Sequence, residues 1–353
     1  MRPVRANLVV VGGGPVGLAA AIEGRNAGLS VLLVEPRAGP VDKACGEGLM
    51  PGTVAALDRL EVTVSGATFR GIRYVAPNGR TCATHLFAAG PGLGVRRTEL
   101  HAALAARAVD AGVVQYSDRV AGLRRSQDDG SPGMCVELDD GSTLTGDWVL
   151  GCDGLHSMVR RTTGLGRGSD GRRFGIRRHA ARGPWSDVVE VHWSAIGEAY
   201  VTPISDQEIG VAVLGPRGWS FDDAIATFPA LARRLRGVDW TTSARGAGPL
   251  RQKVSSPVSG RVLLVGDAAG YVDALTGEGL RIGLACAQAA VRSVVAERPQ
   301  DYPPRWRSLT REYRWLTSGL VTATRIRPVR HALVPVAARL PRVFGAAVNT
   351  LAR

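Results

Sequence analysis

Short, wholly apolar runs and a glycine-rich turn open the chain. Residues 7–11 form an apolar run typical of a buried strand, residues 12–17 supply the turn, and residues 18–26 form an Ala-rich helical segment. A second apolar run at residues 30–34 predicts another buried strand. This order of strand, turn, helix and strand is typical of the dinucleotide-binding unit of a parallel sheet.

The middle of the chain changes to the alternating pattern of antiparallel strands. Helical composition at residues 53–60 and 98–111 comes first, and residues 139–141 then form a good hairpin turn. A helical segment is expected at residues 221–235. Further strands, with Asp206 in a turn between the last two, are predicted at residues 148–150, 188–193, 199–202 and 209–214. The pattern therefore predicts a second, antiparallel sheet.

The last third returns to the first pattern. Residues 261–265 read as a fully buried strand and residues 280–295 as a long Ala-rich helix. The final 50 residues alternate helical runs with Pro328, Pro335 and Pro341, which predicts short helices packed on the outside. Because no internal repeat or low-complexity linker separates these parts, we expect interleaved domains.

Composition narrows the class of protein. Hydrophobic residues make up 45% and charged residues 21%, as in soluble globular proteins. The formal charge of +13 is carried almost entirely by dispersed arginines without helix-turn-helix or zinc-finger spacing, so nucleic acid is not an expected partner. Five scattered cysteines argue against a disulfide framework and a metal site, and they fit a reducing cytoplasm. No apolar window is long enough for a membrane span.

The glycine-rich turn has the spacing of a dinucleotide-binding motif. Gly12 permits a tight turn, Gly14 lets the backbone approach a pyrophosphate, and Gly17 lets helix and strand pack closely. Glu35 ends the second strand 18 residues after Gly17, where its carboxylate is placed to bind a ribose. This motif alone does not separate NAD from FAD.

Two later segments favour FAD. Asp153 and Gly154 follow a buried strand, with Arg160 one helical turn later, and Asp267 follows another buried strand. An aspartate at a strand end binds a ribityl hydroxyl, while the helix start at residues 277–280 faces the flavin. The sequence therefore predicts three turns that converge on one extended flavin nucleotide.

At these residues the chain resembles the flavoprotein superfamily that includes aromatic hydroxylases (group A flavoprotein monooxygenases), flavin-dependent halogenases and geranylgeranyl reductases. The resemblance covers about residues 8–295. Residues 43–49 are similar to the Cys-Gly-Gly loop of geranylgeranyl reductases, although Cys45 fits an ordinary loop residue equally well. Arg97 resembles the arginine of an Arg-x-x-Leu helix start that contacts FAD, and Arg96 is its alternative in register.

The resemblance implies FAD as cofactor, with NAD(P)H as electron donor. It places the first motif and its acid on the adenosine half, Asp153 and Gly154 by the pyrophosphate, and Asp267 on the ribityl chain. The expected FAD contacts are Gly12, Gly14, Pro15, Val16, Gly17, Glu35, Pro36, Arg37, Cys45, Gly46, Gly48, Arg97, Val120, Asp153, Gly154, Asp267, Gly277, Gly279 and Leu280.

We expect an α/β fold: a Rossmann-like FAD-binding domain of the glutathione-reductase type, interleaved with an antiparallel-sheet substrate domain and followed by a helical C-terminal segment. The discontinuous FAD-binding domain would comprise residues 1–75, 96–165 and 255–298. The substrate domain would comprise residues 76–95 and 166–254, and the C-terminal helices residues 299–353.

The reaction is less constrained than the cofactor. The residues around Asp267 resemble reductases and halogenases more than hydroxylases, because Gly270 stands where hydroxylases usually carry histidine. Typical halogenase and geranylgeranyl reductase tryptophan motifs are missing from the substrate sheet. Monooxygenation of a small hydrophobic aromatic or alkene substrate, by hydroxylation or epoxidation, leads because it needs no protein nucleophile. Reduction of a carbon–carbon double bond is the rival, and a non-redox flavin or prenyl-binding protein is the third hypothesis.

No catalytic residue is assigned from sequence. The acid–base candidates are His179, His192, Tyr200, Asp273 and Glu278. A hydrophobic pocket or simply a core would account for Trp185, Trp193 and Trp219. The tail from residue 306 onward mixes arginine with apolar residues at helical spacing, which fits a lid over the core or a helix lying on a membrane surface. We therefore expect a cytoplasmic protein with optional peripheral membrane contact.

Overall fold

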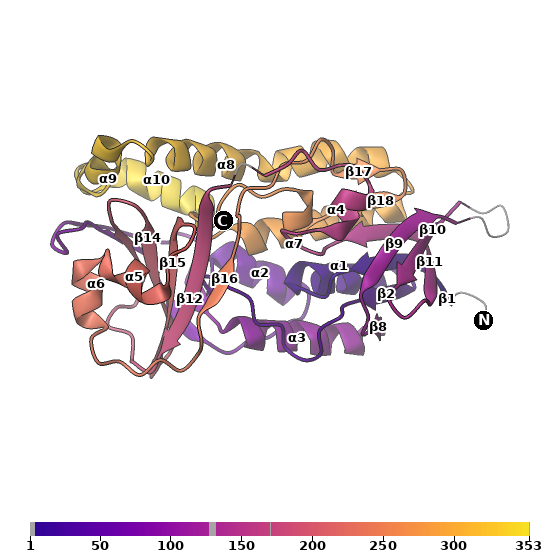
Figure 1. Ribbon diagram of the computed structural model, residues 1–353, viewed down its shortest axis with the longest axis horizontal. Coiled ribbons are helices and arrows are strands. Elements are labelled where there is room, and N and C mark those ends of the chain that lie inside the picture. Colours follow the sequence, from indigo (N-terminus) through magenta and orange to yellow (C-terminus); the bar gives the residue numbers. More distant parts are fainter. Residues whose placement is uncertain (1–3, 127–131, 170, 353) are drawn as a thin grey trace.

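The computed structural model describes residues 4–126, 132–169 and 171–352. The ends of the predicted domains at residues 1–3 and 353 lie outside these ranges. The molecule is elongated, with one large sheet at each end and the C-terminal helices along one long side (Figure 1). Both parallel and antiparallel sheets are present, so the α/β fold with two sheets and a helical C-terminus is confirmed.

An eight-stranded sheet contains the N-terminal strand at its centre. Its main path is β17-β18-β11-β1-β2-β8, and β10 and β9 extend it from β11. β1 is parallel to both β11 and β2, as the first apolar runs predict. The strands are β1 (Val4–Val11), β2 (Val31–Val34), β8 (Val114–Tyr116), β9 (Val120–Arg125), β10 (Met134–Leu138), β11 (Thr143–Gly151), β17 (Val258–Ser259) and β18 (Val262–Leu264).

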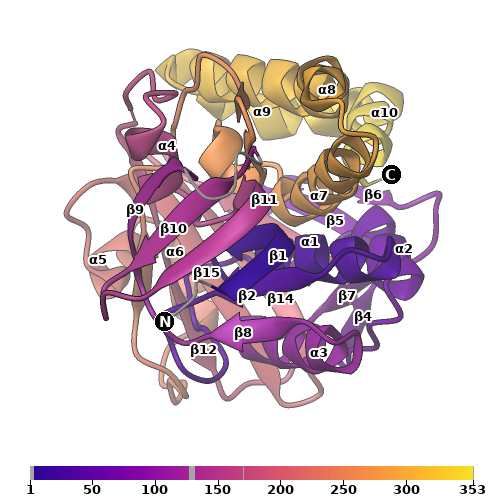
Figure 2. The same cartoon turned by 90° about the vertical axis from the view of Figure 1, so that its right-hand side faces the viewer.

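Helices cover this sheet and explain its continuous apolar strands. All four residues of β2 are buried, which happens when both faces of a parallel sheet are covered. α1 packs against both α7 and α3, and Figure 2 shows these helices beside the sheet. The helical elements of this part are α1 (Pro15–Asn26), α2 (Pro51–Arg59), α3 (Arg97–Asp110), α4 (Met158–Thr162), η1 (Gly266–Ala269) and α7 (Gly279–Val295).

A seven-stranded sheet forms the other end, in the order β16-β12-β15-β14-β13-β5-β6. Its pairs are antiparallel except β13 with β5. The strands are β5 (Gly71–Val75), β6 (Cys82–Leu86), β12 (Arg173–Ala180), β13 (Val189–Trp193), β14 (Glu198–Ser205), β15 (Glu208–Pro216) and β16 (Arg245–Ala247). A small sheet joins the two parts, made of β3 (Gly48–Leu49), β7 (Gly92–Gly94) and β4 (Ala67–Phe69).

Two local expectations need correction. The helical segment at residues 221–235 is broken into α5 (Phe221–Ala226) and α6 (Pro229–Arg234), because Pro229 has no N–H to continue the first helix. β5 pairs with β13 and β6, so the chain enters the second sheet before the boundary expected at residue 76. The predicted domain limits otherwise stay predictions.

The C-terminal helices form an outer layer. They are η2 (Pro299–Asp301), α8 (Tyr302–Ala323), α9 (Arg327–Arg339) and α10 (Pro341–Ala352). α8 packs on α7, whereas α9 and α10 pack on β6 of the second sheet. Between these helices and that sheet lies an apolar cluster that includes Trp193, Val334 and Phe344 and that extends to Met50 and Leu275. We call it the helix–sheet cluster.

Candidate functional site

The glycine-rich turn lies directly on the segment that carries Asp153. Gly12 has a φ of +103°, and a Cβ there would lie 2.8 Å from the Cα of Asp153. A Cβ at Gly17 would lie 1.8 Å from the carbonyl oxygen of Gly12. Only glycine permits this approach of helix, turn and neighbouring strand, as the motif predicts. Pro15, the first residue of α1, is buried, and Val16 approaches Gly266 from the same turn.

Glu35 closes the turn from the end of β2. Its Oε2 accepts a hydrogen bond of 2.8 Å from the Gly13 N–H, and its Oε1 accepts one of 2.6 Å from Arg37 Nε. Burial acts to raise the pKa of Glu35, but the hydrogen bonds and charge of Arg37 and the Gly13 N–H outweigh it and leave the pKa below its ordinary value. Glu35 is therefore a buried carboxylate anchored to the turn. Pro36, which lies between Glu35 and Arg37 in the chain, is exposed.

Arg160 ties the second segment to the third. Asp153 Oδ2 accepts hydrogen bonds from the backbone N–H groups of Met158 and Val159 at 2.6 and 3.1 Å, which caps α4. Arg160 Nη1 in α4 donates to the carbonyl oxygens of Asp267 and Ala268 at 3.3 and 3.1 Å. The turns near residues 12, 153 and 267 therefore meet, as predicted.

Two cations face this junction. Arg97 Nη2 would lie 3.8 Å from a Cβ at Gly14, and Lys43 Nζ would lie 3.8 Å from one at Gly154. Neither side chain forms an ion pair within the described part of the chain. Burial raises the pKa of Asp267, against the charges of Lys43, Arg97 and Arg160. Burial lowers the pKa of Lys43, and the nearby Arg37 and Arg97 charges lower it further.

Arg96 and Arg97 point in different directions. Arg96 turns away to Glu208, to which its Nε donates at 2.7 Å, whereas Arg97 points to the glycine turn. The Arg97 backbone N–H donates to Glu47 Oε1 at 2.8 Å, and His179 Nε2 lies 2.5 Å from Glu47 Oε2. Glu47 is buried and has a φ of +57°. It holds the 43–49 loop between α3 and β12.

Sequence reasoning missed three residues here: Lys43, Glu47 and His101. His101 Nε2 lies 2.9 Å from the Gly13 carbonyl oxygen, so it braces the turn from α3. Lys43 and Glu47 belong to the loop that the resemblance singled out, and their charges beside Cys45 were the available signal. Nothing comparable marked His101, because its contact joins residues far apart in the chain.

The loop after Asp267 meets the 43–49 loop and the second sheet. A Cβ at Gly277, whose φ is +70°, would lie 3.5 Å from Met50 Cε. Thr202 Oγ1 donates to the Gly46 carbonyl oxygen at 2.8 Å, and no described atom outside residues 45–47 lies within 4 Å of a Cβ at Gly46. Open space therefore remains beside the Cys45–Gly46 segment.

The other predicted contacts are placed less centrally. Gly48 lies beside Phe69 in the small sheet, and Gly279 begins α7 beside Tyr271. Leu280 packs against the core of the eight-stranded sheet. Val120 is buried at the start of β9, with no hydrogen bond that links it to the other described site residues. A role in FAD binding stays a prediction for each residue of the site.

The five acid–base candidates all have structural partners. Asp273 is held by Arg173 at 2.9 Å, which also binds Glu198. Tyr200 donates to the Leu275 carbonyl oxygen at 2.8 Å. The remaining three pair as follows: His179 with Glu47, His192 with Glu190 and Glu278 with Arg281.

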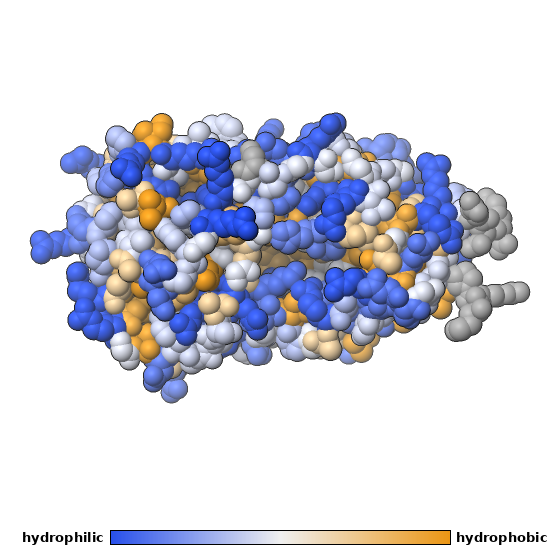
Figure 3. Space-filling model, in the orientation of Figure 1, coloured by the Kyte–Doolittle hydropathy of each residue, from blue (hydrophilic) through white to orange (hydrophobic). Residues whose placement is uncertain are grey.

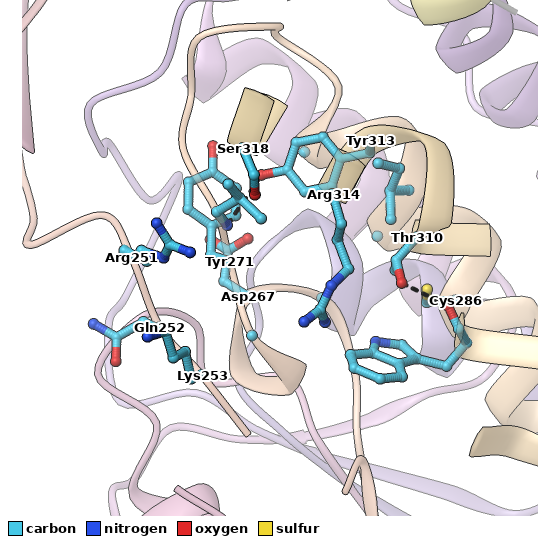
Figure 4. A pocket seen from close by; sticks show the side chains of 17 residues that line it. Arg251, Gln252, Lys253, Asp267, Tyr271, Cys286, Thr310, Tyr313, Arg314 and Ser318 are labelled. Carbon is cyan, nitrogen blue, oxygen red and sulfur yellow. Dashed lines mark hydrogen bonds between the residues drawn. The ribbon is translucent and has the colours of Figure 1, made fainter. Parts of the chain in front are cut away.

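The three tryptophans do not share a pocket. Trp185 donates to Glu190 at 3.0 Å, and Trp193 is buried against Tyr74. Trp219 fills the space beside Gly215 of β15 and Gly197, which precedes β14. A cavity of about 120 Å³ lies elsewhere, between η1, α7 and α8. Arg314 points its guanidinium into that cavity from α8, with Tyr271 and Asp267 on the opposite wall (Figure 4).

Comparison with known proteins identifies the family. The FAD binding domain family model matches residues 5–213, from β1 through most of β15. The chain belongs to the FAD binding domain family. Its FAD cofactor fits the residues at the junction: Arg97 Nε and Asp153 Oδ1 are buried without a hydrogen-bond partner among the described residues. An anionic pyrophosphate would also offset the charges of Lys43 and Arg97.

Relatives of this FAD binding domain protein include reductases. Menaquinone reductase of Mycolicibacterium smegmatis is 29% identical over 88% of this chain and 81% of its own length. Digeranylgeranylglycerophospholipid reductase of Methanothrix thermoacetophila is 25% identical over 86% of this chain and 83% of its own. The fold matches p-nitrophenol 4-monooxygenase of Pseudomonas putida, with a TM-score of 0.78, 20% identity and 99% of both chains covered. The predicted superfamily and flavin-dependent oxidoreductase class are thus confirmed.

We expect Glu278 to make folding stability depend on pH. Burial raises its pKa to about 7 against the opposing effect of Arg281, and Glu312 of α8 adds to the rise. An unfolded glutamate releases its proton near pH 4.5, so stability should fall as pH rises from there to about 7, and then level off. Glu278→Gln should lack this decline. Melting temperatures at pH 5 and pH 8 test this, and an equal difference between the two proteins at both values would exclude Glu278 as the cause.

Proposed function

We propose that the protein reduces a carbon–carbon double bond in the isoprenoid chain of a hydrophobic lipid, with FAD as redox cofactor. The extent of the sequence similarity carries this proposal. The two reductases match 88% and 86% of this chain, which necessarily includes most of the second sheet. Menaquinone and digeranylgeranylglycerophospholipid both carry isoprenoid chains.

The position of the helix–sheet cluster supports an apolar substrate. This cluster includes Leu275, two residues before Gly277 at the expected flavin edge, and Met50, which approaches Gly277. The cluster therefore brings apolar side chains next to the place where the flavin ring is expected. An isoprenoid chain needs such a lining, because each buried CH₂ contributes about 0.8 kcal/mol.

The chain's own residues have separable tasks in this proposal. When bound and reduced, FAD supplies two electrons, to a carbon atom of the substrate or to dioxygen. Lys43, Arg97 and Asp267 would bind and orient the nucleotide. Saturating a double bond also requires a proton, and Tyr200 is the best placed candidate because its hydroxyl lies at Leu275 within the apolar cluster. Burial raises the pKa of Tyr200 well above its usual range, so the hydroxyl holds its proton.

Monooxygenation is the second candidate. It is favoured by the full-length fold match to p-nitrophenol 4-monooxygenase. Monooxygenation also requires no free acid or base from the protein. This fits the finding that all five acid–base candidates are held by structural partners. NAD(P)H is the proposed electron donor in both cases.

Anaerobic reduction separates these reactions. We expect purified protein to be yellow, to bleach with NADPH or NADH under nitrogen, and to regain its colour when a polyprenyl lipid is added, with a product two mass units heavier. Reoxidation only when oxygen is admitted in the presence of the substrate, with a product that has gained one oxygen atom, would favour the monooxygenase. A colourless preparation that carries a bound prenyl lipid would instead support a non-redox carrier.

A further inference from the structure

The outer surface of the C-terminal helices is unusually apolar for an exposed surface. Thirteen large hydrophobic side chains are exposed in the described chain, and seven of them belong to residues 302–352. Trp315 is the most exposed, at 75%. The seven are Leu309, Trp315, Ile326, Val329, Val336, Leu340 and Val343. Such a concentration marks an interaction site more often than a bare solvent surface.

The same surface is strongly cationic. Residues 302–352 contain one acidic residue, Glu312. None of the exposed arginines there forms an ion pair with a described carboxylate. These arginines are Arg305, Arg307, Arg311, Arg314, Arg325, Arg327, Arg339 and Arg342. We call the exposed side chains of residues 302–352 the C-terminal surface, apart from Arg314, whose guanidinium points into the cavity between η1, α7 and α8.

The helices present this surface as one outer layer. α8, α9 and α10 lie together along the side of the molecule away from α3 (Figure 2). Hydrophobic side chains interrupt the hydrophilic surface at the end where α9 and α10 lie (Figure 3). Val329 and Val336, seven residues apart, fall on the same face of α9. Val334 and Phe344, on the inner side, belong to the helix–sheet cluster.

We infer that the C-terminal surface docks on an anionic phospholipid bilayer. Arginine and tryptophan on one amphipathic surface match the two chemistries of that interface, lipid phosphate and the outer acyl region. A second copy of this chain would bring two cationic surfaces together, and nucleic acid would leave the exposed apolar side chains without a partner. No described helix is long and apolar enough to cross a bilayer.

This inference goes beyond the proposed reaction and does not depend on it. It also gives the helix–sheet cluster a position directly beneath the bilayer-facing helices. Because the cluster also contains Leu275, it extends from these helices to the expected flavin edge.

Vesicle cosedimentation of the FAD-loaded protein tests the inference. We expect binding to vesicles of phosphatidylcholine with phosphatidylglycerol, weak binding to phosphatidylcholine alone, and release by salt. Arg325→Gln/Arg327→Gln/Arg342→Gln should weaken binding to the anionic vesicles by about a hundredfold, roughly fivefold for each charge. Trp315→Ser/Val343→Ser should weaken it by about tenfold or more.

A matched variant controls for net charge. Arg217→Gln/Arg233→Gln/Arg236→Gln removes the same charge from exposed residues after β15 and in or directly after α6, and this variant should bind the vesicles like the unmodified protein. FAD content and melting temperature verify that each variant is folded. Equal binding to both vesicle types, or equal loss in the two arginine variants, would overturn the inference. Failure to bind vesicles would also overturn the inference if the protein instead bound a DNA or RNA duplex tightly or formed a dimer. In that case the C-terminal arginine variant should lose the duplex binding or the dimer.

Discussion

Replacement of Gly17 with alanine should abolish FAD retention and lower the free energy of unfolding by about 3 kcal/mol. The new Cβ would lie 1.8 Å from the Gly12 carbonyl oxygen, a backbone atom that has no rotamer by which to move away. α1 would have to shift from the turn, and its N-terminal N–H groups would leave the position where a pyrophosphate binds. The absorbance ratio of flavin to protein and the melting temperature measure the two effects.

Gly319→Ala is the matched control. Gly319 also lies in a helix, α8, but apart from its chain neighbours and the backbone of its own helix no described atom lies within 4 Å of a Cβ at that position. This variant should keep its FAD and gain up to about 1 kcal/mol of stability, because alanine favours helix over glycine. Stoichiometric FAD and an unchanged melting temperature in the Gly17 variant would contradict this prediction. They would show that FAD binding does not require the close packing of α1 on the turn.

Sequence could predict those parts of the site whose residues lie within one short segment of the chain. The turn at residues 12–17, Glu35 and the aspartates at 153 and 267 each follow a buried apolar strand, and parallel strands bring their ends to one edge of a sheet. Local pattern therefore predicted both the elements and their convergence. The break before Pro229 was readable in the same way and was overlooked.

The parts that sequence could not predict depend on pairs far apart in the chain. Glu47 is explained by the positions of His179 and the Arg97 N–H, and Asp273 by that of Arg173. The pairs Glu47–His179 and Arg173–Asp273 join the FAD-binding part to the second sheet across a hundred residues or more. Periodicity carries no information on such pairs, so acidic and basic residues with structural partners looked like candidates for acid–base catalysis.

Lys43 is the residue missed from sequence whose loss should matter most for the cofactor. Lys43→Met should raise the dissociation constant for FAD by about 10- to 100-fold, the range for one charge-assisted hydrogen bond. Its amine faces Gly154 and Arg97 without an ion pair to a described carboxylate, so an anionic pyrophosphate is the partner that its charge lacks. Titration of FAD into the apoprotein measures the change, and Lys43→Arg should restore most of the affinity.

The pH dependence of FAD binding distinguishes a charge contact from a structural role for Lys43. Burial and the charges of Arg37 and Arg97 lower the pKa of Lys43 from 10.5, so the amine should lose its proton, and FAD affinity should fall, before the pH reaches that value. Lys43→Met should bind FAD weakly without this alkaline decline. Arg119→Met, which removes a charge from an exposed ion pair with Asp139, should leave both affinity and its pH profile unchanged. An alkaline decline that persists in Lys43→Met would assign the titration to another group and end the argument for this amine as the pyrophosphate ligand.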